Sequence, residues 1–136
     1  PVNLFVAGFV GSPAMNFLEG TISKRDGAVS VKRADGLEVS IAGYEFSSQP
    51  EEGRKVILGV RPEQITIGNG AASKLPVTVS LIDPMGADGL LWGTVGKDQV
   101  SVRIGAEDTF AIGEIVQAGF QPALASVFDA ESGNRI

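Results

Sequence analysis

Residue types that perform catalysis near neutral pH are scarce in this sequence. It contains no His and no Cys, which excludes a Ser–His–Asp triad, a thiol nucleophile, a disulfide and a zinc site built on His or Cys. Two adjacent carboxylate pairs remain, Glu51–Glu52 and Glu107–Asp108. Both stand beside Gly or polar turn residues, whereas acid–base catalysis requires a buried cleft. We therefore interpret both pairs as solvated surface groups.

The sequence also lacks a loop of the kind that binds nucleotide phosphates. A P-loop needs Gly, four spacers and then Gly-Lys-Ser/Thr, so that backbone amides surround the phosphates. Gly96–Lys97 is the nearest match, but Asp98 replaces the hydroxyl residue and Leu91 stands where the first Gly belongs. We interpret this segment as a hairpin turn. We expect no catalytic residue and no cofactor, metal or sugar site in this chain.

Four basic residues flank one predicted hairpin: Lys24, Arg25, Lys32 and Arg33. A nucleic-acid-binding barrel would interleave aromatic stacking platforms with such residues, and the nearest aromatic residues are not interleaved with these. The formal net charge of −5 also opposes binding to nucleic-acid phosphates or to an anionic membrane surface. We expect a solvated hairpin and no nucleic-acid partner.

The elements that must position any functional residue are strands. Apolar and polar residues alternate over residues 29–32, 37–41, 77–81 and 100–104, a pattern typical of strands with one buried face. Turn sequences separate such runs, at residues 25–27, 34–36, 68–70 and 96–98. The sequence predicts an all-β, barrel-like fold of about eight to ten short strands. No internal repeat is strong enough to assert.

The amino-terminal end has a different pattern. Phe5 and Phe9 lie four residues apart in an apolar stretch, on one face of a helix, and Gly11–Ser12–Pro13 is suited to end that helix. We predict that residues 3–10 are the last turns of a short amino-terminal helix. Because residue 1 is Pro rather than Met, we expect the chain to be part of a longer protein.

Two apolar sites are candidates for contact with another protein. Trp92 is the only Trp; core packing is its usual role, but Trp is also enriched at interface hot spots. Val127–Phe128 is an apolar pair near the end of the chain, beside charged and small residues. It fits either a last core strand or an apolar patch with a polar rim.

Four segments, in a fixed order along the chain, resemble one protein family. They are residues 5–18 (FVAGFVGSPAMNFL), residues 58–65 (LGVRPEQI), Gly86–Ala87–Asp88 with Leu91–Trp92–Gly93, and Val127–Phe128–Asp129 followed by Gly133 and Arg135–Ile136. Together they resemble the regulatory domain in the ATP-binding subunits of bacterial ABC carbohydrate importers, of the maltose and sn-glycerol-3-phosphate type. The matching motif residues, expected to be structural, are Gly11, Ser12, Pro13, Met15, Asn16, Arg61, Pro62 and Glu63.

The resemblance implies tandem OB-fold-like barrels, called a TOBE domain, over residues 15–136, with residues 1–14 as the end of a linker helix from an ATPase domain. It implies a non-catalytic regulatory domain that helps to hold a homodimer of ATP-binding subunits, in the cytoplasm beneath the permease subunits at the inner membrane. ATP and Mg would bind in the ATPase domain, and in some members a regulatory protein binds this domain. Phe128, Val127 and Trp92 would lie where two such domains meet.

The resemblance leaves one alternative open. Modules that bind small oxyanions in molybdate or sulfate systems use the same barrel family. They hold the anion with backbone amides and with basic or hydroxyl groups at subunit interfaces. In this sequence the basic and hydroxyl groups are dispersed, so we rank this function second.

Overall fold

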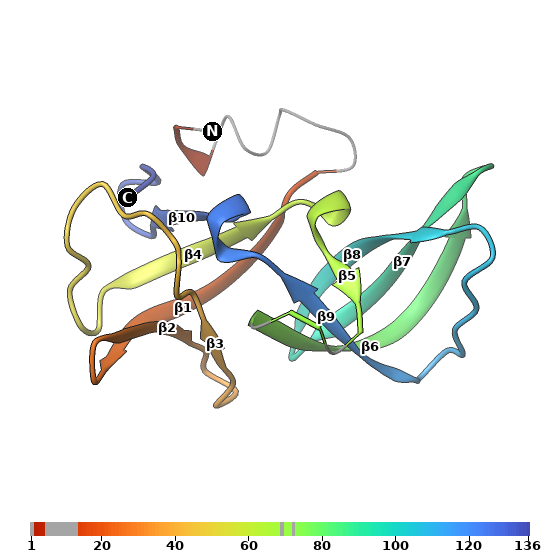
Figure 1. The fold of residues 1–136 in the computed structure, drawn as a ribbon, viewed down its shortest axis with the longest axis horizontal. Coiled ribbons are helices and arrows are strands. Elements are labelled where there is room, and N and C mark those ends of the chain that lie inside the picture. Colours follow the sequence, from red (N-terminus) through yellow and green to blue (C-terminus); the bar gives the residue numbers. More distant parts are fainter. Residues whose placement is uncertain (1, 5–13, 69, 72) are drawn as a thin grey trace.

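Two curled antiparallel sheets of five strands each lie side by side (Figure 1). The computed structural model describes residues 2–4, 14–68, 70–71 and 73–136, and these hold ten strands and two short 3-10 helices. The predicted all-β fold of OB-type barrels is confirmed. The predicted helix over residues 3–10 and the motif residues Gly11, Ser12 and Pro13 lie mostly or entirely outside the described residues.

The first sheet, on the left in Figure 1, has the strand order β10-β4-β1-β2-β3. Its strands are β1 (Asn16–Arg25), β2 (Ala28–Lys32), β3 (Glu38–Ser40), β4 (Lys55–Val60) and β10 (Ser126–Asp129). The predicted turn between β1 and β2 is a two-residue hairpin in which Asp26 and Gly27 have positive φ angles of 50° and 81°. These are the backbone angles for which Asp-Gly is preferred in hairpins.

The second sheet has the order β5-β9-β6-β7-β8. Its strands are β5 (Thr66–Ile67), β6 (Ser73–Pro84), β7 (Asp88–Val95), β8 (Asp98–Gly105) and β9 (Ile115–Phe120). Gly96–Lys97 is the hairpin turn between β7 and β8, as predicted, because Val95 pairs with Asp98. In β6 the register shifts between Val79 and Leu81, so that a bulge at Ser80 interrupts the regular alternation.

Each sheet receives one strand from a segment that begins in the other sheet. From β4 the chain passes through the 3-10 helix η1 and enters the second sheet as β5. From β9 it passes through η2 and returns to the first sheet as β10. The two helices are η1 (Pro62–Gln64) and η2 (Pro122–Leu124). This reciprocal exchange interlocks the two sheets.

The exchange reveals an internal repeat. β4 and β9 alternate in the same way between exposed and buried positions. Gly59 and Gly119 occupy equivalent places in the two strands, and Pro62 and Pro122 each begin the helix that follows. The two strand–helix segments are therefore structurally equivalent.

One continuous apolar core runs through both sheets. It joins buried side chains of the first sheet, such as Leu18 and Leu58, to those of the second, such as Leu91 and Val102. The barrels therefore share one hydrophobic interior.

The two ends of the described chain also meet: Asn3 forms a bridge with Asn134, and the Leu4 amide donates to the Gly133 carbonyl at 2.9 Å.

Candidate interaction surfaces

The structure places Val127 and Phe128 in the interior. Both side chains on β10 are 0% exposed. They point to opposite faces of the first sheet, as neighbours on a strand do: Val127 joins the main core, and Phe128 joins a small separate cluster with Met15 and Leu4. The expected surface position of this pair is therefore wrong, because the amino-terminal part of the same chain covers Phe128.

Met15 and Phe128 form a tight packing unit with two neighbours. The Phe17 ring meets the Phe128 ring edge-on, with centroids 6.3 Å apart. A Cβ atom on Gly59 would lie 2.5 Å from the Met15 sulfur and 3.1 Å from the Phe128 ring. These close approaches explain why a glycine stands in the middle of β4. The motif residue Met15 is thus a structural residue, as expected.

Asn16 joins the two sheets through its side chain. Its Nδ2 donates to the Ser101 carbonyl at 2.8 Å, and its Oδ1 accepts from the Ser101 amide at 2.9 Å. The amide group of Asn16 therefore satisfies the edge of β8 as the peptide group of a neighbouring strand would. Asn16 is buried, so this motif residue is structural as well.

Arg33 makes a second link between the sheets. Its guanidinium donates to the carbonyls of Glu19 (3.1 Å) and Val95 (3.2 Å), and it pairs with Asp98 at 2.7 Å. Asp35 lies 3.6 Å from its Nε. The Arg33 side chain is only 6% exposed, so its expected place in a solvated basic cluster is wrong. An arginine can be buried at this position because carbonyl and carboxylate oxygens surround it.

The Tyr44 side chain makes several hydrogen bonds near the end of the chain, a role that the sequence did not indicate. Its hydroxyl accepts hydrogen bonds from the Val127 amide (3.1 Å) and from the Arg135 guanidinium (3.2 Å), and it donates to the Ile136 carbonyl (3.1 Å). The guanidinium also lies over the Tyr44 ring, 5.8 Å from its centroid. A single tyrosine in a polar loop carries no sequence signal for such a role.

Asp129 ends β10 and organises the turn that follows it. Its carboxylate accepts from the amides of Ser132 (2.7 Å) and Glu131 (2.9 Å) and pairs with Arg54 at 2.9 Å. The hydrogen bond from the Ser132 amide, followed by that from the Arg54 guanidinium, lowers the pKa of Asp129 from 3.8 to about 2. This carboxylate stabilises a turn and is not poised for acid–base chemistry at neutral pH.

The motif residues Arg61, Pro62 and Glu63 lie at the crossing from β4 to β5. The Arg61 amide donates to the Gln64 side chain at 3.0 Å. Pro62 is buried and begins η1, where the absence of an amide hydrogen carries no penalty. Glu63 is exposed. Pro62 begins the crossing between the sheets, and the structural role expected of Arg61 and Glu63 stays a prediction.

Trp92 is the one predicted interface residue that the structure leaves partly exposed. It lies on β7 directly opposite Leu81 of β6, and both point away from the core because Leu91 and Gly93 point inward. The bulge at Ser80 turns Leu81 to the same outer side as Thr78. Without the bulge, alternation would place Leu81 in the interior.

We call this outer surface of the second sheet the β6 face. It consists of Pro76, Thr78 and Leu81 of β6, Trp92 and Thr94 of β7, and Ile115 and Gln117 of β9. Leu81 is 55% exposed and Ile115 is 66% exposed. An apolar cluster of this kind on a sheet face is typical of a protein–protein contact.

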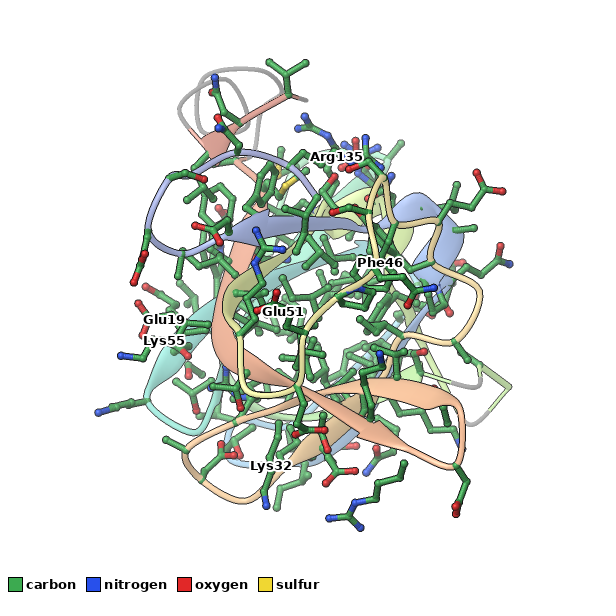
Figure 2. The ribbon with its side chains drawn as sticks, turned by 90° about the vertical axis from the view of Figure 1, so that its left-hand side faces the viewer. Glu19, Lys32, Phe46, Glu51, Lys55 and Arg135 are labelled. Atoms are coloured by element: carbon green, nitrogen blue, oxygen red, sulfur yellow. The ribbon has the colours of Figure 1, made fainter. Side chains whose placement is uncertain are left out.

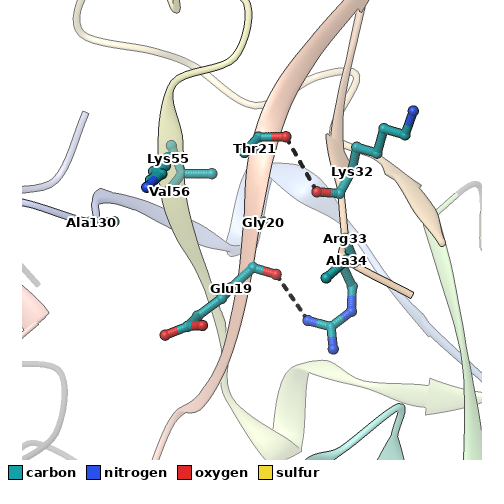
Figure 3. Close-up of a pocket in the computed structure, with 9 residues that line it drawn as sticks. All are labelled: Glu19, Gly20, Thr21, Lys32, Arg33, Ala34, Lys55, Val56 and Ala130. Carbon is teal, nitrogen blue, oxygen red and sulfur yellow. Dashed lines mark hydrogen bonds between the residues drawn. The ribbon is translucent and has the colours of Figure 1, made fainter. Parts of the chain in front are cut away.

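Two grooves lie on the surface of the described residues. A groove of about 550 Å³ crosses the outer side of the first sheet, where Lys32 and Lys55 flank Thr21 (Figure 3). The side chains of Glu19, Lys32 and Lys55 point outward from this sheet (Figure 2). A second groove of about 550 Å³ contains the predicted pair Glu51–Glu52, which is exposed.

The described residues also contain no cluster of three His, Cys, Asp or Glu side chains placed to hold a metal ion. In the same part of the chain, no helix has the length and apolar character needed to span a membrane. What the structure presents is an interlocked double barrel with one apolar outer face.

This arrangement defines the class of protein. The TOBE domain model matches residues 58–128, and the MalK OB fold domain model matches residues 11–65. The first match covers more than half of the 136 residues, and the chain therefore belongs to the TOBE-domain family.

Similar proteins of known name narrow the class further. The chain is 38% identical to the sn-glycerol-3-phosphate import ATP-binding protein UgpC of Paraburkholderia xenovorans, over 99% of the chain and 37% of that protein. It is 35% identical to the UgpC of Salmonella typhi, over 100% of the chain and 37% of the relative. It is 34% identical to an uncharacterized ABC transporter ATP-binding protein, YcjV, of Escherichia coli O157:H7, over 97% and 36%. The chain thus spans little more than a third of these relatives.

A solved structure confirms the fold. The cytoplasmic molybdate-binding protein ModG superposes with a TM-score of 0.68 over 82% of this chain and 94% of that chain, at 15% sequence identity. At this identity the likeness shows a shared double-barrel architecture and nothing about the ligand.

Proposed function

We propose that this chain is the carboxy-terminal regulatory domain of the ATP-binding subunit of an ABC-type importer for sugars or related polyol compounds. The observation that supports this most strongly is the match along 97% to 100% of the chain to proteins named as import or ABC transporter ATP-binding proteins. In this proposal the remainder of the protein is an ATPase domain that binds ATP and Mg, and the parent subunit is the enzyme.

The proposed role is mechanical. Two regulatory domains hold a homodimer of subunits together while the ATPase domains open and close beneath the permease subunits, on the cytoplasmic side of the inner membrane. A stiff tether keeps the second ATPase domain at high effective concentration. The exchanged strands and the contacts of Asn16 and Arg33 supply this stiffness. A regulatory protein is a further partner in this proposal.

A nucleotide-binding assay should distinguish the 136-residue chain from the intact subunit. The 136-residue chain should give no saturable signal with a fluorescent ATP analogue, because it contains no phosphate-binding loop. The intact subunit should bind the analogue in the presence of Mg. Micromolar binding by the 136-residue chain alone would refute the proposed division of labour.

The second-ranked function, a module for small oxyanions, shares this fold. Calorimetric titration with molybdate and sulfate distinguishes the two functions. We expect no heat of binding from the chain. A tight isotherm with either anion would favour the oxyanion module instead.

A further inference from the structure

The β6 face is uncharged along its length and charged at its two ends. All seven of its residues, named above, are neutral. On the same outer side of β6, Lys74 precedes the strip and Asp83 follows it. Both side chains are exposed, and neither has a hydrogen bond or ion pair within the described part of the chain. A positive end, an apolar middle and a negative end therefore follow one another along a single strand.

We propose that the β6 face is the surface through which two copies of this chain pair, with their β6 strands antiparallel. This inference rests on the proposed function, in which two regulatory domains hold a dimer, and it names the contact surface. Trp92, Leu81 and Ile115 provide the apolar centre. Lys74 of each copy lies beside Asp83 of the other.

The arrangement follows from symmetry. A contact between two identical surfaces is isologous and has a two-fold axis. For two sheets packed face to face, an axis parallel to β6 would put Lys74 against Lys74 and Asp83 against Asp83. An axis perpendicular to β6 puts each Lys74 beside an Asp83 and brings Thr78 of the two copies near the axis. Only the second arrangement pairs opposite charges.

Electrostatics also favours defined charge pairs at this surface. Each copy carries a formal net charge of −5, so two copies repel one another at long range. The uncharged strip removes local repulsion, and the two Lys74–Asp83 pairs add attraction at its ends. An oppositely charged arrangement of this kind sets the register of a contact more than it adds affinity.

The size of the face predicts weak pairing by the domain alone. From Lys74 to Asp83 the strand extends roughly 26–30 Å, and three strands are roughly 14 Å wide. That is about 400 Å² per copy, below the ~800 Å² per partner of a standard stable interface. Association of the isolated domain should therefore require high protein concentration, whereas tethering within the intact subunit would make the same contact effective.

Charge reversal tests the register. Lys74→Glu should weaken self-association of the chain by about fivefold or more, because two attractive pairs become repulsive, and so should Asp83→Lys. The double variant Lys74→Glu/Asp83→Lys should recover the wild-type dissociation constant. Lys32→Glu is the matched control, since Lys32 is also exposed and has no ion pair in the described structure. Sedimentation equilibrium of the wild type and the four variants gives the constants. Failure of the double variant to recover would overturn the proposed register.

Cross-linking tests the face itself. This domain has no Cys, so Thr78→Cys introduces its only thiol next to the predicted axis, and the unsubstituted intact subunit serves as the background control. We expect disulfide-linked dimers of the Thr78→Cys intact subunit under mild oxidation, and none of Thr21→Cys, a half-buried threonine on the first sheet. If neither variant is linked although the intact subunit is dimeric, the β6 face is wrong and the proposed function stands. If the intact subunit is monomeric at all concentrations, the dimer-holding role fails as well.

Discussion

At the scale of single residues, Asn16 shows how a side chain can complete a sheet. It satisfies both the amide and the carbonyl of Ser101 on the edge of β8. No pattern in the sequence predicts this contact, because the two residues are 85 positions apart. The family resemblance marks Asn16 as a motif residue, but only the structure gives the reason.

Asn16→Ala should therefore destabilise the fold. Removal of the side chain leaves two buried backbone groups unpaired, at a cost of about 2–4 kcal/mol. The free energy of unfolding from urea titration measures the effect. Asn134→Ala, at an exposed position, is the control and should change stability little. A loss below about 0.5 kcal/mol in Asn16→Ala would show that water replaces the contact.

The sequence left two positions open for the Phe128 side chain, a core strand or a protein–protein interface. Its burial at 0% exposure decides for the core. Phe128→Lys should unfold the chain or lower its melting temperature by more than about 10 °C, since it buries an unpaired ammonium group. A thermal melt of the variant at neutral pH provides the measurement. A stable monomer with an unchanged melt would contradict the core position.

Asp129 should make stability depend on pH at the acid end. Its pKa is about 2 in the folded chain and 3.8 as the ordinary value, so the unfolded chain binds the proton more tightly. Its contribution is then fully present above about pH 4 and is lost as the pH falls through the folded pKa near 2. The stability difference between wild type and Asp129→Asn should shrink over this window. A stability difference that stays constant between pH 4 and pH 2 would contradict this contribution.

At the scale of elements, the sequence predicts strands that have one solvent-exposed face. It does not predict strands that other parts of the chain cover on both faces. The alternating runs 29–32, 37–41, 77–81 and 100–104 lie in or overlap β2, β3, β6 and β8. β4 (KVILGV) contains consecutive apolar residues without alternation. Such runs occur where chain also packs on the outer side of a sheet, as Met15 and Phe128 do on β4.

The internal repeat was hidden for a related reason. The segments 56–65 (VILGVRPEQI) and 116–125 (VQAGFQPALA) share only Val, Gly and Pro. Those residues meet the backbone needs of the crossing, and the other positions pack against different neighbours in each half.

The candidate interface could not be predicted from the sequence either, because the bulge at Ser80 decides which side Leu81 faces. A bulge has no reliable sequence signal.

The β1–β2 hairpin gives a prediction at this scale. Gly27 has a φ angle of 81°, and no atom lies within 4 Å of an added Cβ. Gly27→Ala should therefore cost about 1 kcal/mol through backbone strain alone. Urea titration measures this cost. Gly70→Ala, where the φ angle is not in the left-handed region and space is also open, should cost less; an equal cost would point away from backbone strain.

At the scale of the whole molecule, the two barrels act as one body. A shared core, two exchanged strands and the contacts of Asn16 and Arg33 resist their separation. We expect a single cooperative unfolding transition rather than one for each barrel, visible as coincident curves from Trp92 fluorescence in the second sheet and far-ultraviolet circular dichroism. Two separated transitions would show that the barrels unfold independently.

In the proposed function, this domain holds two ATP-binding subunits together. The direct measurement is the dissociation constant of the intact subunit dimer without nucleotide, compared with that of a subunit lacking residues 15–136. We predict that the shortened subunit still binds ATP and Mg, while its nucleotide-free dimer dissociates at least about tenfold more readily, a loss of roughly 1.4 kcal/mol. Equal dissociation constants for the two proteins, with both folded and both binding ATP, would contradict the account.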